Sequence, residues 1–381
     1  MSQDREEVLT EDSSAAPAGV SGGVAGAPGR PAWFGRLDLD HIDLRRSTGV
    51  VVFLLVAVYV LFGASEFNQY EASLVLVFAV AAIGQDWLMG RAGQISLGAA
   101  AFMAVGAYTT ARLSTESWAP FPLPTIISAA FGCVLGLIVG LTGLRLRGIY
   151  LALSTLALQF IVAFAAQEYQ GSNQAGFVAA TPKIGGFAFG TVQRLNQLML
   201  VVLALVILGL GGLYRRAPGR AWSAIRQNEA AAAVAGVNVV RWKLLAFIGS
   251  SGVIAVAGSL YAFQASTVSY VPFSIDLAVS ILVMVFIGGL GSMTGAIIGA
   301  VFVELLPNWI QQATNHFQGN AGLSSWLQTN SAELALAIYG LALLLVLIFE
   351  RDGVVGILNR VASLVARQAR RRIGTARGAR T

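Results

Sequence analysis

Charge is scarce in this 381-residue chain. Only 12% of its residues are charged and 56% are hydrophobic, whereas a soluble domain carries about 25% charged residues. Apolar runs close to the ~20 residues needed to cross a bilayer recur, for example at 50–62, 198–213 and 334–349. This composition excludes an ordinary soluble domain. It predicts an all-α, polytopic transmembrane helical bundle.

The residues that metal, disulfide and nucleotide sites require are also scarce. A single cysteine, Cys133, excludes an intramolecular disulfide and a cysteine-cluster metal site. The two histidines, His41 and His316, are too few and too far apart in sequence to indicate a metal site. No Gly-Lys pair occurs, which excludes a P-loop. We therefore expect no cofactor, no metal and no catalytic residues.

The apolar runs predict about ten membrane spans. The boundary of the fourth span and the junction of the eighth and ninth are the least sharply marked, because apolarity barely falls there. The predicted spans lie near 48–64, 71–89, 94–112, 124–143, 149–167, 196–213, 244–265, 276–291, 293–308 and 332–349.

The basic residues predict the orientation of these spans. If the N-terminus is cytoplasmic, all but Arg112, Lys183 and Arg194 of the 25 Lys and Arg residues fall on the cytoplasmic side. Both termini are then inside, and the net charge of +6 reflects membrane topology rather than nucleic-acid binding. The predicted parts are a disordered segment at 1–46, a transmembrane domain at 47–350 with a cytoplasmic loop at 214–243, and a basic tail at 351–381.

The stretch GRAGQISLGAAAFMAVGAYTTA, residues 90–111, is unusual for a membrane helix because it begins with polar residues and glycines. Glycine disfavours helix interiors by ~1 kcal/mol. Non-helical backbone at membrane depth is tolerated only inside protein or beside water. The stretch therefore predicts a break in the helix, buried in the bundle. Its candidate pathway or packing residues are Gly93, Gln94, Ser96, Gly98 and Ala100.

Glycines elsewhere predict close helix packing. Gly132, Gly136 and Gly140 form overlapping GxxxG motifs, as do Gly295 and Gly299 in a later span. The segment that begins at Gly93 also resembles the one that begins at 291, which suggests an internal repeat of the kind that marks transporter pathways. Further candidate pathway or packing residues are Gly288, Gly289 and Gly291.

The loop GRAWSAIRQNEAAAAVAGVNVVRWKLLAF, residues 219–247, predicts a cytoplasmic helix over 221–235 that Gly236 and Asn238 terminate. Its alternatives are a helix lying on anionic lipid headgroups and an element that docks on a partner protein. Because the helix is rich in alanine rather than in large apolar residues, docking is favoured.

Polar residues within the spans allow two interpretations. Asp86 precedes Arg91 by five residues near the predicted cytoplasmic end of its span, where an ion pair reaching the interface is expected. Thr155, with Ser154 and Gln159, could line a solute path, although such hydroxyls more often bond to their own helix.

Five segments together resemble the longer of the two permease subunits of branched-chain amino acid (LIV-type) ABC importers. They are 90–111, 145–160, 219–247, 281–307 and 338–356, and the resemblance covers most of 70–358. In such permeases the loop carries a motif that docks on the ATPase. Carried over, the coupling residues are Arg226, Glu229, Ala231, Ala232 and Gly236. The chain departs from the expected family pattern at 85–87, so no role is carried over to those residues.

The resemblance implies half of a translocation pathway in a bacterial plasma (inner) membrane. The implied partners are ATPase subunits, a second related permease, a periplasmic or lipid-anchored solute-binding protein and membrane lipid, and no nucleic acid. The small-molecule solute stays open between branched-chain amino acids and urea or other amides. The alternative function is an ion-coupled secondary transporter, whose coupling would need buried ionisable residues such as Asp86 and Glu304.

Overall fold

The computed structural model describes residues 66–115, 120–143, 148–171, 176–184 and 186–316, together with 337, 338, 340 and 341. All of them belong to one compact unit, 43–381. The predictions for 1–46, for the span 48–64 and for the tail 351–381 lie outside the described residues. So does nearly all of the predicted span 332–349.

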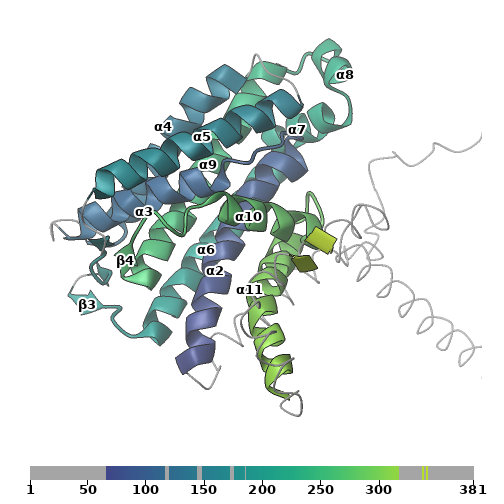
Figure 1. Cartoon of the computed structure of the whole chain (residues 1–381). Helices are drawn as coiled ribbons and strands as arrows, with labels where there is room; N and C mark the ends of the chain where they lie inside the picture. Colours follow the sequence, from purple (N-terminus) through teal and green to yellow (C-terminus); the bar gives the residue numbers. More distant parts are fainter. Residues whose placement is uncertain are drawn as a thin grey trace, which may run out of the picture. The chain divides into compact units, whose positions relative to one another are not determined.

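The described chain is almost entirely helical (Figure 1). Its helices are α2 (Glu66–Asp86), the π-helical turn η2 (Trp87–Arg91), α3 (Ala99–Thr115), α4 (Leu123–Gly143), α5 (Ile149–Gln170), α6 (Val192–Arg215), α7 (Ala217–Gln227), α8 (Glu229–Val234), α9 (Val239–Ala265), α10 (Ile275–Gly288) and α11 (Met293–His316). Two short antiparallel pairs join β1 (Phe177–Val178) to β4 (Thr267–Val268) and β2 (Lys183–Ile184) to β3 (Phe187–Ala188).

Five of the described helices are long and apolar enough to cross a membrane. They are Gln69–Arg91, Leu123–Gly143, Ile149–Gln170, Val192–Arg215 and Val239–Ala265, and Ile275–Gly288 and Met293–Trp309 are shorter apolar helices. The predicted helices at 71–89, 124–143, 149–167, 196–213 and 244–265 are therefore confirmed. An all-α membrane protein is confirmed with them.

The helices differ in how much of their surface the described chain covers. Nearly all of α2 is buried, whereas most of α4, α5 and α6 is not. Large apolar side chains such as Ile138, Phe164 and Leu208 are more than half exposed. A soluble protein rarely exposes apolar surface on this scale, so these faces suit a bilayer or another membrane subunit.

Glycines permit the closest helix contacts, as the GxxxG motifs predict. A Cβ at Gly136 of α4 would lie 2.6 Å from the Ser251 hydroxyl of α9, and one at Gly299 of α11 would lie 2.7 Å from the Met284 carbonyl carbon of α10. Small residues let backbones approach where hydrophobicity gives no net drive between helices in lipid. The contacts of α9 with α2, α3 and α4 place it at the centre of the described helices.

Figure 1 shows α7 and α8 at one end of the long helices and β3 and β4 at the other. The first end carries the predicted cytoplasmic loop, and we call it the loop end. Most of the candidate site residues belong to the loop or to the segments that contact it at this end.

Candidate functional site at the loop end

The unusual stretch after η2 is not helical over residues 92–98. The predicted helix 94–112 is therefore wrong at its start, because α3 begins only at Ala99. Gly93 has a φ of +68°, and the Gln94 side-chain amide donates to the Lys243 carbonyl at 3.0 Å. The Ser96 carbonyl accepts from the Gln85 side chain at 2.7 Å. The Gln85 side chain thus satisfies a backbone carbonyl of the non-helical stretch, and Gln94 joins the stretch to the start of α9.

Thr155 of α5 secures the end of the same stretch. Its hydroxyl accepts from the Leu97 amide at 2.9 Å and donates to the Ala152 carbonyl at 2.9 Å. A Cβ at Gly98 would lie 3.1 Å from the Thr155 carbonyl oxygen. Ser96, Gly98, Ala100 and Thr155 are all buried, so the structure places these candidate residues within the packed bundle between α3 and α5.

The predicted loop helix 221–235 is broken into α7 and α8, so the prediction of one helix is wrong. Asn228 lies between them in an extended conformation, and its side chain accepts from the Ala231 amide at 3.1 Å. Asparagine is a strong helix N-cap, and this cap signal within an otherwise helix-forming sequence explains the break. Asn238 does not stop a helix but caps α9, accepting from the Arg241 amide at 3.0 Å.

Gly236 ends α8 as predicted. Its φ is +83°, and the amides of Gly236 and Val237 donate to the carbonyls of Ala233 and Ala232, both at 3.0 Å. This pair of bonds is a Schellman motif, whose left-handed residue is usually glycine. The short helix is therefore closed at both ends by its own sequence.

The exposed face of α8 consists of small and apolar side chains. Ala231 is exposed, Ala232 is buried and Val234 is 91% exposed. Glu229 forms an ion pair with Lys243 at 2.7 Å, with its side chain 45% exposed. The ion pair connects α8 to the start of α9, whereas nothing in the described chain covers Val234.

The loop and the non-helical stretch line one cavity of about 570 Å³. The predicted pathway residues Gly93 and Gln94 and the predicted coupling residue Glu229 all contribute to it. The structure therefore brings part of the predicted coupling group and part of the predicted pathway group together. The full lining is Gly93, Gln94, Ile95, Gly143, Gly148, Leu151, Glu229, Ala230, Ala233, Val239, Val240 and Lys243.

The predicted span 276–291 ends early, because α10 stops at Gly288 and a turn follows. Gly289 and Gly291 have φ angles of +106° and +87°. Gly291, like Gly93, precedes a helix, which agrees with the suggested repeat. The two segments nevertheless differ in length, because α11 begins at Met293 and α3 only at Ala99.

Asp86 does not form the expected ion pair with Arg91. It is fully buried, and its Oδ1 accepts from the Gly291 amide at 2.6 Å. The Arg91 guanidinium lies over the Tyr214 ring instead, 4.8 Å from its centroid. The sequence could not show this contact, because Asp86 of α2 and Gly291 of the α10–α11 turn lie 205 residues apart in the chain.

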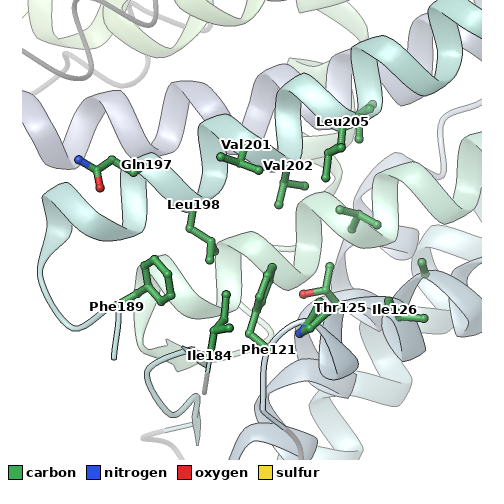
Figure 2. A pocket seen from close by; sticks show the side chains of 14 residues that line it. Phe121, Thr125, Ile126, Ile184, Phe189, Gln197, Leu198, Val201, Val202 and Leu205 are labelled. Carbon is green, nitrogen blue, oxygen red and sulfur yellow. The ribbon is translucent and has the colours of Figure 1, made fainter. Parts of the chain in front are cut away.

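A second cavity, of about 760 Å³, lies between α4 and α6 (Figure 2). Its lining is mainly apolar and includes Phe121, Ile126, Leu198, Val202 and Leu205. The ammonium and carboxylate of an amino acid need polar partners when they leave water. This cavity is therefore a poor site for such a solute.

Comparison with known proteins identifies the family of this helical membrane protein. The family of permease components of branched-chain amino acid transport systems matches residues 70–347. The high-affinity branched-chain amino acid transport system permease protein LivM of Salmonella typhimurium is 30% identical over 70% of this chain and 68% of its own. LivM of Escherichia coli is 29% identical with the same coverage.

A relative with another solute in its name is also similar. The autoinducer 2 import system permease protein LsrC of an Enterobacter species is 27% identical over 48% of this chain and 54% of its own. No solved structure matches the chain. The family match begins in α2 and continues past α11, so it covers the whole site described above. The chain belongs to the permease component family of branched-chain amino acid transport systems, and it is a membrane-spanning subunit of an ABC importer in which partner subunits hydrolyse ATP.

Proposed function

We propose that this subunit forms half of a translocation pathway for branched-chain amino acids in a bacterial plasma membrane. Its LivM relatives are named for that solute, which supports the choice over urea or another amide. A second related permease completes the pathway, and a periplasmic or lipid-anchored binding protein delivers the solute. The partition into a segment at 1–46, a domain at 47–350 and a tail at 351–381 belongs to this proposal, as do ten spans and two cytoplasmic termini.

The exposed face of α8 carries the coupling part of the proposal. Val234 and Ala231 project from a helix whose ends are capped and whose Glu229 is fixed to Lys243. An isolated helix this short is unstable in water, so the caps and the ion pair supply its order. A preformed apolar face of small side chains is suited to a groove on an ATPase subunit.

Substitution of Val234 by Asp is expected to weaken co-purification of the ATPase subunit by about tenfold or more, because burying an unpaired charge in an interface costs several kcal/mol. The side chain is 91% exposed, so folding of the permease is unaffected. Pull-down of the ATPase by tagged permease, with the permease level held equal, measures the loss.

The matched control is Val178→Asp in β1, which is 61% exposed and lies on the predicted outer side. It should retain the ATPase in full. Equal retention by Val234→Asp and wild type would remove α8 from the ATPase interface. Uptake by the permease alone, driven by an ion gradient, would instead favour the secondary transporter.

The orientation predicts a simple labelling pattern. In a Cys133→Ser background, a cysteine at Glu229 should react with a membrane-impermeant maleimide only after the cells are opened. A cysteine at Val178 should react in intact cells. Loops rich in basic residues stay in the cytoplasm, whereas the loop that contains Val178 has few basic residues and is expected outside. Both side chains are exposed in the described chain, and the permease is expressed without its ATPase so that α8 stays uncovered. Labelling of both from the same side would contradict the proposed topology.

A further inference from the structure

Two backbone turns from distant parts of the chain meet at the loop end. Gly90 lies in η2 at the end of α2, and Gly291 lies between α10 and α11. A Cβ at Gly291 would be 3.1 Å from the Gly90 carbonyl oxygen. The Asp86 carboxylate joins the two turns by accepting from the Gly291 amide at 2.6 Å. The end of α2 and the α10–α11 turn are therefore in direct contact.

Arg226, near the end of α7, adds the loop to this contact. Its Nη1 donates to the Gly90 carbonyl, and a Cβ at Gly291 would lie 2.7 Å from the same Nη1. Its aliphatic part passes Gly93, where an added Cβ would lie 3.7 Å from the Arg226 Cγ. One side chain thus lies beside three glycines, and the missing side chain at Gly291 leaves room for its guanidinium.

Trp222 fixes α7 at the same place. It is almost fully buried, its ring packs edge-on against Trp87 of η2 at a centroid distance of 5.3 Å, and its Nε1 donates to the Trp242 carbonyl at 2.8 Å. Arg226 follows Trp222 by one helical turn, so both side chains leave the same face of α7. Two side chains of one face of α7 therefore anchor this helix to the end of α2.

Asp86 and Arg226 supply the polar links of this arrangement. Asp86 is fully buried and its Oδ2 has no hydrogen-bond partner within the described residues. Hydrogen bonds in which one group is charged are roughly twice as strong as neutral ones, so the bond from the Arg226 guanidinium to the Gly90 carbonyl is a strong link at this junction.

We propose that Arg226 and Asp86 are positioning residues that fasten α7 to the ends of α2 and α10, so that displacement of the loop helices moves both membrane segments together. This inference rests on the proposed docking of the loop on an ATPase, and it names the residues that pass the displacement on. Neither residue needs to touch the solute or the ATPase.

The fastening can be measured on the purified full-length chain by hydrogen–deuterium exchange. Substitution of Arg226 by Ala should accelerate exchange in peptides covering 88–95 and 289–293 by about tenfold, since a hydrogen bond to a charged group is lost. Arg226→Lys, which retains a donor, should restore part of the protection. The matched control is Arg220→Ala, because Arg220 lies on the same helix and its side chain makes no hydrogen bond or ion pair with the described residues.

The functional readout is the number of leucine molecules taken up per ATP hydrolysed by the assembled importer in liposomes. Arg226→Ala should lower this ratio about tenfold without lowering ATPase co-purification, and Asp86→Leu should do the same. Asp86→Asn retains the acceptor oxygen and should keep more of the ratio than Asp86→Leu. A merely structural role would reduce uptake and hydrolysis in parallel and leave the ratio unchanged.

Unchanged exchange in Arg226→Ala, or an unchanged ratio of uptake to hydrolysis, would overturn the inference. If the wild-type importer takes up no leucine or retains no ATPase, the proposed function fails instead. The exchange measurement still decides in that case whether Arg226 holds the turns together.

Discussion

Substitution of Gly98 by Leu is expected to reduce solute uptake by about tenfold or more while the chain still inserts into the membrane. The added Cβ alone would lie 3.1 Å from the Thr155 carbonyl oxygen and 3.4 Å from the Thr155 Cβ. The rest of a leucine side chain cannot fit unless α3 and α5 separate. Separation breaks the bond between the Leu97 amide and Thr155, which leaves a partly buried donor unpaired at a cost of up to about 1–3 kcal/mol.

Uptake of radiolabelled leucine at matched membrane levels of the protein measures this effect. Gly211→Leu is the control, because Gly211 lies in α6 and a Cβ there meets no atom within 4 Å. Thr155→Val, which removes the acceptor at similar volume, should show a smaller loss than Gly98→Leu. Wild-type uptake by Gly98→Leu would show that the stretch does not depend on its contact with α5.

The helices themselves were predictable because a bilayer imposes a length on them. Apolar runs near 20 residues mark α4, α5, α6 and α9 closely, since every backbone group in lipid must be satisfied within the segment. The start of α3 was not marked by apolarity. The glycines at 93 and 98 indicated a break, but only contacts with Lys243 and Thr155, from other helices, define where it ends.

The loop shows why local propensity was insufficient. Residues 221–235 are good helix formers except at Asn228, where a cap can compete with helix continuation. The sequence contains that cap signal at Asn228. The alanines that follow it favour a continuous helix, and this led to the prediction of a single helix. Gly236, in contrast, has a single physical role as a left-handed helix terminator, and its prediction was confirmed.

The least predictable part of the site is the segment 85–87. Gln85 bonds the Ser96 carbonyl, Asp86 bonds the Gly291 amide and Trp87 packs against Trp222. Each partner lies on another element. A pair of residues that meet only in the fold leaves no periodicity or spacing in a single sequence, so the local expectation of an Asp86–Arg91 pair failed.

Substitution of Gly288 by Ala is expected to destabilise the permease, whereas the same substitution at Gly212 is expected to leave it unchanged or stabilise it. Both glycines are helical. A Cβ at Gly288 would overlap the Gly295 carbonyl and would lie 3.0 Å from the Ala296 amide nitrogen. These are backbone atoms of α11, which cannot turn aside as a flexible side chain does, so overpacking should cost about 1–3 kcal/mol or more. At Gly212 of α6 no atom lies within 4 Å, and alanine is favoured over glycine in a helix by ~1 kcal/mol.

The thermal midpoint of the detergent-purified chain, followed by size-exclusion chromatography after heating, should therefore fall in Gly288→Ala and stay equal or rise in Gly212→Ala. Gly295→Ala tests the same contact from α11, because its Cβ would lie 2.8 Å from the Gly288 carbonyl carbon. An equal midpoint in Gly288→Ala and Gly212→Ala would show that α10 and α11 can move apart at no cost. The turn at Gly291 could then not be held in register with Asp86 by packing, because the helices that set its position would be free to slide. A large drop confined to Gly288→Ala and Gly295→Ala would mean that α10 and α11 move as one unit. The contact at Gly291 then displaces both helices together.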